Sequence, residues 1–196
     1  LPIDANEDFT IEGWFKFNDV SARQCLFSAW GGSSQPRIRV EINKTAGKFS
    51  TTVGSNAADW SASHYTFGSW LETDTWYHIA LVREGTAAGC FRLYVNGGLL
   101  DYYDHTGAVG NFSSAGLSIG ANVYDTDTIY APMNGSVADF RWSKGLARYS
   151  EGASVTTGAT FTPPSTYSTS TWDTTTTAAG TPGYTPKFGI ASAYFD

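Results

Sequence analysis

The chain has 196 residues, with twelve Lys and Arg against eighteen Asp and Glu, and a formal net charge of −6. One domain is the default at this length, and the acidic balance argues against nucleic acid as a partner, because phosphates are neutralised by clustered Lys and Arg. No apolar run approaches the roughly 20 residues that span a bilayer, and an aromatic content of 15% is typical of a folded domain rather than a disordered one.

Apolar and polar residues alternate along most of the chain, and this alternation predicts half-buried strands. In 9–17, Phe9, Ile11, Phe15 and Phe17 share one face. The same pattern continues through 49–53, 91–95, 99–102, 117–120 and 137–142, and in 37–42 it places Arg39 and Glu41 outward. The run 76–82 is instead apolar on both faces, which suits a central strand. The pair Asn96-Gly97 supplies the two positive-φ positions of a tight hairpin. Glycines separate the runs, and no helical stripe is present, so we predict an all-β sandwich.

Composition changes after Pro163-Pro164. Residues 165–187 are rich in Ser, Thr, Gly and Pro, which predicts a linker or a loop lying over the domain. Residues 188–196 become apolar again and predict a terminal strand without a partner nearby in the sequence. The residues that would carry this strand's contacts are Phe188, Ile190, Tyr194 and Phe195.

Six motifs in one order resemble the laminin-G-like branch of the concanavalin A-like lectin/glucanase superfamily, which also contains pentraxins. They are FTIEGWF at 9–15, LFS at 26–28, WYHIALVR at 76–83, LYVNG at 93–97, SIG at 118–120, and NG at 134–135 followed by DFRW at 139–142. The resemblance covers 1–164 and implies a jelly roll of two antiparallel sheets. The stretches 144–149 and 161–164 are similar to a closing signature of phage tail-fibre and other virion-surface proteins.

One departure from the family pattern concerns its first strand. The family carries a strand with a Tyr-Phe-Asp-Gly-like ending before the first motif, and this chain opens too late to hold it. Residues 188–196 resemble that strand. The tail would then begin the next unit of a tandem array, fold back onto its own domain, or complete a neighbouring subunit by strand donation.

Residues that could support catalysis are sparse. Superfamily glucanases carry Glu-x-Asp-x-x-Glu on one strand, and the nearest approach here is 72–77, where Glu72 and Asp74 are followed by Tyr77 in place of the third carboxylate. No histidine pair has metal-ligand spacing, so neither a glycosidase nor a zinc enzyme is expected. Cys25 and Cys90 are expected to be small buried residues, with one disulfide as the alternative.

Calcium is the cofactor that the resemblance suggests. Asn122, Asp125 and Asp127 follow the SIG motif, where pentraxin-like relatives carry calcium ligands, and their oxygens suit calcium. The second contributing loop of the family would fall near 31–35, which has no carboxylate. The alternative is that Asp125 and Asp127 are solvated turn residues.

Aromatic residues in or near apparent loops are the second binding signal, because flat rings stack on sugars. The candidates are Trp60, Tyr65, Trp70, Tyr102, Tyr103, Tyr124 and Tyr130. The alternative is that these rings cover a sheet face or form subunit contacts. Trp14, Trp30, Trp76 and Trp142 lie in predicted strands and are expected to pack.

From these observations we expect a concanavalin A-like jelly roll over 1–164, a linker over 165–187 and a terminal strand over 188–196. The expected function is a non-enzymatic structural and adhesive module of an extracellular or virion-surface fibre, self-associating through its C-terminal strand, with a glycan as candidate ligand. No nucleic acid or membrane partner is expected. The alternative is a free-standing, calcium-dependent carbohydrate-binding lectin.

Overall fold

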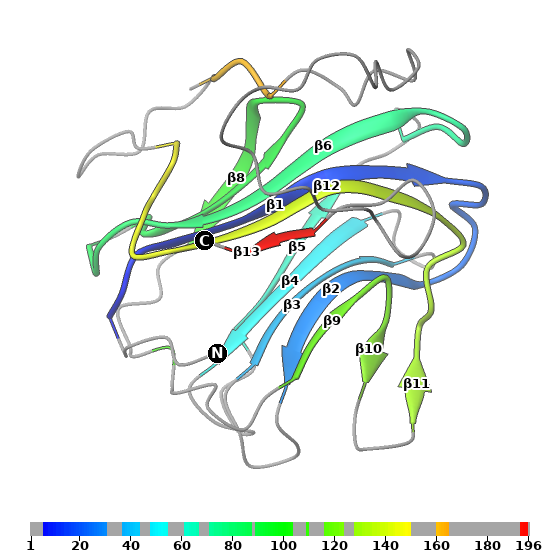
Figure 1. Cartoon of the computed structure of the whole chain (residues 1–196), viewed down its shortest axis with the longest axis horizontal. Helices are drawn as coiled ribbons and strands as arrows, with labels where there is room; N and C mark the ends of the chain where they lie inside the picture. The colour runs from blue at the N-terminus through cyan, green and yellow to red at the C-terminus, as the bar shows by residue number, and fades with distance from the viewer. Residues whose placement is uncertain are drawn as a thin grey trace, which may run out of the picture.

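The computed structural model describes residues 6–30, 37–43, 48–54, 61–66, 71–87, 89–103, 109, 116–123, 128–149, 160–164 and 193–195. These residues form strands and turns, and no helix among them is long and apolar enough to cross a membrane. Two sheets lie face to face as layers, with a small two-stranded ribbon at one end (Figure 1). The predicted all-β jelly-roll sandwich is confirmed.

The six-stranded sheet contains the first strand of the domain at its centre. Its order is β13 (Ala193–Phe195), β12 (Gly135–Lys144), β1 (Phe9–Phe17), β6 (Trp76–Arg83), β7 (Phe91–Val95) and β8 (Gly98–Tyr103). The β7–β8 hairpin turns at Asn96 and Gly97 with φ of 50° and 81°, as the sequence predicts. Every pairing in this sheet is antiparallel except that of β12 with β13.

The second layer is a five-stranded antiparallel sheet, seen beneath the first in Figure 1. Its order is β5 (Ser61–Thr66), β4 (Lys48–Gly54), β3 (Arg37–Asn43), β2 (Gln24–Trp30) and β9 (Gly116–Ile119). The ribbon pairs β10 (Asn122–Val123) with β11 (Ile129–Tyr130). Strand β5 and the ribbon were not predicted, because 61–66 carries no apolar alternation and the ribbon strands have two residues each.

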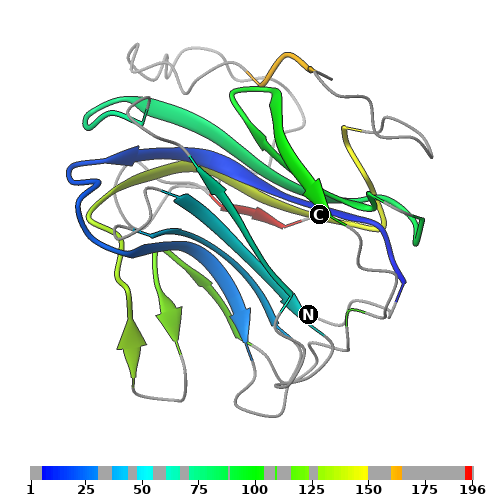
Figure 2. The ribbon, with the colours of Figure 1, turned by 180° about the vertical axis from the view of Figure 1, so that it is seen from behind.

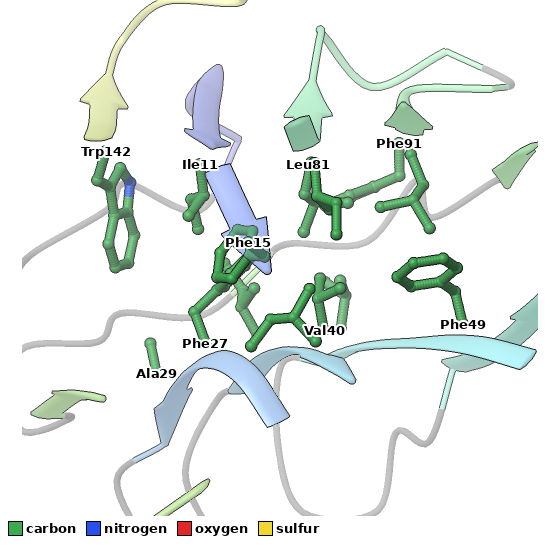
Figure 3. Packing of buried hydrophobic residues seen from close by; sticks show 14 of the residues in the cluster. Ile11, Phe15, Phe27, Ala29, Val40, Phe49, Leu81, Phe91 and Trp142 are labelled. Atoms are coloured by element: carbon green, nitrogen blue, oxygen red, sulfur yellow. The ribbon is translucent and has the colours of Figure 1, made fainter. Parts of the chain in front are cut away.

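The core lies between the two layers. Figure 3 shows Ile11, Leu81, Phe91 and Trp142 extending from the six-stranded sheet toward Phe27, Ala29, Val40 and Phe49 of the other sheet, with Phe15 between them. Phe15 and Phe27 lie 6.4 Å apart between ring centroids, and Phe27 meets Phe140 edge-on at 5.8 Å. The period-two pattern therefore identifies the buried face of each long strand.

The outer face of the five-stranded sheet differs from the prediction. Alternation placed Arg39 and Glu41 outward, and they do lie opposite the core, but both are almost fully buried. Arg39 Nε lies 3.3 Å from Glu41 Oε2, and Arg23 Nη2 forms a second ion pair with Glu41 Oε1 at 2.5 Å. Burial of these charged side chains is tolerated because opposite charges lie next to each other. Alternation in the sequence shows which face a residue lies on, but it does not show whether that face is buried or solvated.

The chain that follows β12 crosses the outer face of the six-stranded sheet. We call residues 145–149 and 160–164 the strap. Ala147, Tyr149 and Phe161 pack against a second apolar cluster on that face, formed by Ala80, Val82 and Tyr94. The Phe161 amide donates to the Gly97 carbonyl at 2.9 Å. The closing signature seen in the sequence therefore covers the sheet.

The terminal strand β13 lies beside β12 at the edge of the six-stranded sheet, as both views of the ribbon show (Figures 1 and 2). Its register sets Ala193 opposite Phe140 and Phe195 opposite Trp142. Within a single chain the tail thus adds to its own sheet, which is the fold-back arrangement. Phe188 and Ile190 lie outside the described residues, as does the predicted linker over 165–187.

Substitution at Gly97 tests the docking of the strap. In Gly97→Ala, the new Cβ would lie 1.9 Å from the Phe161 carbonyl oxygen, at a φ of 81°. We expect the free energy of unfolding to fall by about 3 kcal/mol in urea titrations. Gly85→Ala is the matched control, since Gly85 also has a positive φ, 64°, but nothing within 4 Å, so it should lose only about 1 kcal/mol. Equal losses would contradict the docking.

Candidate functional site

The carboxylate of Glu12, on the outer face of β1, has hydrogen-bond partners on several elements. Its neighbours on that face come from β12, where Arg141 is its direct partner in register, and from β6, where His78 pairs with Trp14. Arg141 donates to Glu12 Oε1 from Nε at 2.9 Å and from Nη2 at 2.5 Å. His78 Nε2 lies 3.1 Å from Glu12 Oε2. Three strands are therefore joined through one side chain.

The strap supplies the remaining partners of this carboxylate. The Tyr149 hydroxyl donates to Glu12 Oε2, and Arg148 Nε lies 3.8 Å from Oε1. Tyr149 in turn stacks on Phe161, with ring centroids 3.5 Å apart and an interplanar angle of 5°. The strap is therefore held to the sheet by polar contacts to Glu12 and by the stacked rings of Tyr149 and Phe161, which pack on the sheet.

The electrostatics of Glu12 follow from these contacts. Burial by itself would raise the pKa of the Glu12 carboxyl, but hydrogen bonds from His78, Tyr149 and Arg141 outweigh burial and hold that pKa below its ordinary value. Burial and the bond to Glu12 raise the pKa of Tyr149 far above its usual range. The carboxylate is therefore ionised at neutral pH, and Tyr149 stays a proton donor.

A pocket of about 190 Å³ opens beside this cluster on the outer face of the sheet. We call it the outer-face pocket. Its lining combines a flat aromatic ring, two carboxylates, a guanidinium, an imidazole and a strap proline, contributed by Glu12, Trp14, His78, Asp139, Arg141 and Pro164. Trp14 meets the His78 ring edge-on at 5.3 Å.

A bulge in β12 gives Asp139 its place in the pocket. The register changes from Glu12–Arg141 to Trp14–Ala138, so Asp139 and Phe140 together face the single residue Gly13. Asp139 takes a φ of 48°, and bulges commonly redirect a side chain in this way. A Cβ at position 13 would lie 3.3 Å from the Phe140 Cα, so glycine suits the opposing strand. Burial raises the pKa of the Asp139 carboxyl, and Arg141 offsets only part of that effect.

Two polar atoms of the pocket residues have no hydrogen-bond partner among the described residues. They are the indole Nε1 of Trp14 and Nδ1 of His78, both buried. Buried polar groups without partners are uncommon in native proteins and indicate a bound water or ligand. The indole Nε1 can only donate, so a ligand in the outer-face pocket that pairs with it must supply an acceptor.

The calcium prediction involves a second location, the β10–β11 ribbon. Asn122 in β10 is fully buried, and among the described residues neither its side-chain oxygen nor its side-chain nitrogen has a hydrogen-bond partner. Asp125 and Asp127 lie outside the described residues, as does the loop over 31–35. Among the described residues, no three His, Cys, Asp or Glu side chains gather as a metal site. An orphaned buried amide fits a cation ligand, because its oxygen is of the type calcium prefers.

The predicted aromatic residues are only partly placed. Tyr102 lies on β8 and Tyr130 on β11, at distant parts of the fold, so the described structure does not bring these two together. Tyr130 is held by Arg23, whose guanidinium lies 5.0 Å from the ring centroid. Tyr65 lies within strand β5 rather than a loop, and Tyr103 ends β8. Trp60, Trp70 and Tyr124 lie outside the described residues.

The remaining chemical predictions concern carboxylates and thiols. Glu72 and Asp74 are exposed in the turn before β6 and so do not lie on a strand. Cys25 and Cys90 are both buried and form no disulfide, which confirms the favoured interpretation. Burial and the nearby charge of Glu41 raise the pKa of Cys25 to about 12, so this thiol is inert at neutral pH.

Glu12, Asp139 and Arg141 were not predicted as site residues from the sequence, and Trp14 was predicted to pack. One signal was available. His78 is a polar residue in a strand that is apolar on both faces, so it requires a buried polar partner. Glu12 lies on the neighbouring strand of the family motif, but only strand order and register reveal that the two meet.

Substitution of Glu12 tests the anchoring role of its carboxylate. Glu12→Gln leaves Arg141 and Arg148 without their counter-charge, so we expect the free energy of unfolding at pH 7 to fall by about 3 kcal/mol. The contribution of Glu12 is present above its ordinary pKa of 4.5 and is lost as pH falls through its lower folded-state pKa. The difference between wild type and variant should therefore shrink on acidification.

Chemical denaturation at pH 7 and at pH 3 measures both effects. Glu7→Gln is the control, because Glu7 lies 3.5 Å from Lys144 in a partly exposed pair, and its loss should cost less than about 1 kcal/mol. A Glu12→Gln loss that is no larger than the control, or that grows on acidification, would disprove the anchoring role.

Comparison with known proteins places this arrangement in a family. The family model of the concanavalin A-like lectin/glucanases superfamily matches residues 2–150. A comparison with curated protein sequences found no match.

Several solved structures share the fold. A heptameric SAP-like pentraxin from Limulus polyphemus is 19% identical, with a TM-score of 0.52 over 72% of this chain and 65% of its own. Domains LG4-5 of the mouse laminin alpha1 chain are 15% identical, with a TM-score of 0.55 over 72% of this chain and 36% of theirs. The CBM40 of the Ruminococcus gnavus IT-sialidase, bound to alpha2,3 sialyllactose, is 18% identical, with a TM-score of 0.53 over 68% and 73%.

The matched region spans less than two thirds of the pentraxin and laminin chains, and identities below 20% establish the fold alone. The family model covers three quarters of the sequence, and the two-layer sheet topology agrees with it. The chain therefore belongs to the concanavalin A-like lectin/glucanases superfamily.

Proposed function

We propose that this chain is a non-enzymatic adhesive module that binds a glycan in the outer-face pocket and forms part of an extracellular or virion-surface fibre. The observation that carries the glycan assignment is the pocket itself. Its lining combines the Trp14 ring with the carboxyl of Asp139, and Nε1 of Trp14 and Nδ1 of His78 have no partner among the described residues. Aromatic surface with a few polar groups is the usual composition of a small-ligand site.

The comparisons support this assignment at the level of the superfamily. One similar structure is a carbohydrate-binding module in complex with a sialylated lactose, and fold likeness alone does not transfer its ligand. The carboxyl groups argue for binding rather than hydrolysis, because most glycosidases work with a pair of them. Glu12 is committed to its cationic and hydroxyl partners, which leaves Asp139 without a second working carboxyl in the described lining.

Calcium-dependent binding is the second candidate, and the buried amide of Asn122 favours it. Asn122, together with Asp125 and Asp127, would hold the ion. A bound calcium there would offer a cation to sugar hydroxyls.

A glycan array probed with and without a chelator tests both candidates. We expect the full chain to retain bound glycans after chelation, and Asp139→Asn to weaken them about tenfold, because a charged acceptor is replaced by a neutral one. Asn122→Ala should leave the array pattern unchanged. Signals that vanish with chelator and in Asn122→Ala would instead establish the calcium-dependent lectin. A blank array in every condition would reject glycan binding.

We further propose that the C-terminal strand assembles the fibre. The position of β13 supports this, because a strand added at the outer edge of β12 pairs through backbone groups that a neighbour's strand could equally supply. Twenty-eight residues, 165–192, separate the strap from β13. At about 3.3 Å per extended residue this tether can reach an adjacent copy. A head-to-tail contact of this kind builds rings or filaments.

Deletion of 187–196 tests the assembly proposal. Native mass measurement and electron microscopy of the full chain should show ordered multimers, whereas the truncated chain should be monomeric or unstable because the edge of β12 lacks its partner. Replacement of Thr174–Thr177 by serines keeps the tail and should preserve the multimers. Identical multimers after the deletion, or a strictly monomeric full chain, would rule strand donation out.

A further inference from the structure

The outer-face pocket contains both a hydrogen-bond donor and hydrogen-bond acceptors for a ligand. Trp14 offers an N–H donor that no group of the described residues accepts, and the residue is only 8% exposed. The carboxyl of Asp139 offers acceptors in the same lining. A ligand that satisfies this lining must therefore both accept and donate.

From this lining we propose that the outer-face pocket selects uncharged sugars and rejects acidic ones, with Asp139 as the discriminating residue. The inference rests on the proposed glycan-binding function and names the ligand class of that site. A sugar hydroxyl accepts from an N–H and donates to a carboxylate or an imidazole nitrogen at the same time. A carboxylate or sulfate can only accept, and an ammonium group can only donate.

The charges at the pocket make the same distinction. Among the described lining residues Arg141 is the one arginine or lysine, and its Nε and Nη2 both donate to Glu12. Arg148 lies 3.8 Å from the same carboxylate. The charges of these two guanidinium groups are therefore offset by the carboxylates of Glu12 and Asp139, so the described arginines add no excess positive charge that would attract an acidic ligand.

The negative charge of Asp139 disfavours binding of an acidic ligand. The β12 bulge directs its carboxyl to the pocket, where partial burial reduces the screening of its charge by water. A second carboxylate brought beside it would be repelled, and the repulsion of two charges about 4 Å apart at a protein surface corresponds to more than about a tenfold loss of affinity. The like-charge contact acts as a specificity element in addition to the attractive contacts.

An array of matched oligosaccharide pairs tests the proposal on the full chain. Each pair contains a neutral glycan and its sialylated derivative, with lactose and alpha2,3 sialyllactose as one pair. We expect every bound glycan to be neutral, with its acidic partner at least about tenfold weaker. In Asp139→Asn the neutral signal should fall while the ratio of neutral to acidic binding moves toward one, because the repelling charge is gone.

Asparagine is well suited to this substitution, since it tolerates a positive φ better than most residues. Asp101→Asn is the matched control. It makes the same chemical change on β8, at the far edge of the same sheet and outside the pocket lining, and should alter neither signal. Thermal melting of all three proteins checks that the variants are folded.

The outcomes separate this inference from the function on which it rests. Stronger binding of the acidic partner, or an unchanged ratio in Asp139→Asn, would overturn the selectivity and leave glycan binding in place. Absence of binding to any glycan by the wild-type protein would overturn both.

Discussion

The burial of one carboxylate organises the outer face of the six-stranded sheet. Glu12 loses its hydration there, and a buried charge is tolerated only if protein groups replace the water. The replacements come from β12, from β6 and from the strap, through Arg141, His78 and Tyr149. The same contacts that neutralise the charge also fix where the strap crosses the sheet and where the outer-face pocket opens.

The two faces of β1 are therefore stabilised by different interactions, apolar packing on the inner face and mainly polar contacts on the outer face. Its inner face contributes apolar side chains to a close-packed core between the layers (Figure 3), where stability comes from area removed from water. Its outer face contributes Thr10, Glu12 and Trp14, which are buried by the strap and the neighbouring strands. Polar partners determine geometry more narrowly than apolar contact does, because hydrogen bonds require direction as well as proximity. A binding site on the outer face benefits from that rigidity.

The β12 bulge links fold and site. One extra residue opposite Gly13 lets β12 keep Phe140 in the core and Arg141 outside while adding Asp139 to the pocket. The terminal strand meets the same β12, with Tyr194 opposite Arg141 in register. Under the proposed function, the strand that binds a glycan is thus also the strand that accepts the assembling tail. Adhesion and assembly would then share one structural element rather than occupy separate domains.

The sequence by itself determined the sandwich. Period-two alternation over 9–17 and 37–42 identified strands and their core-facing residues, and Asn96-Gly97 located a hairpin, because these signals are local and depend on backbone geometry. The pocket was decided only by tertiary structure. Glu12, His78 and Arg141 are separated by more than 60 residues from one another, and strand order, register and the bulge bring them together. Alternation also could not tell a solvated polar face from a covered one, since burial depends on which distant segment lies across it, as the strap does here.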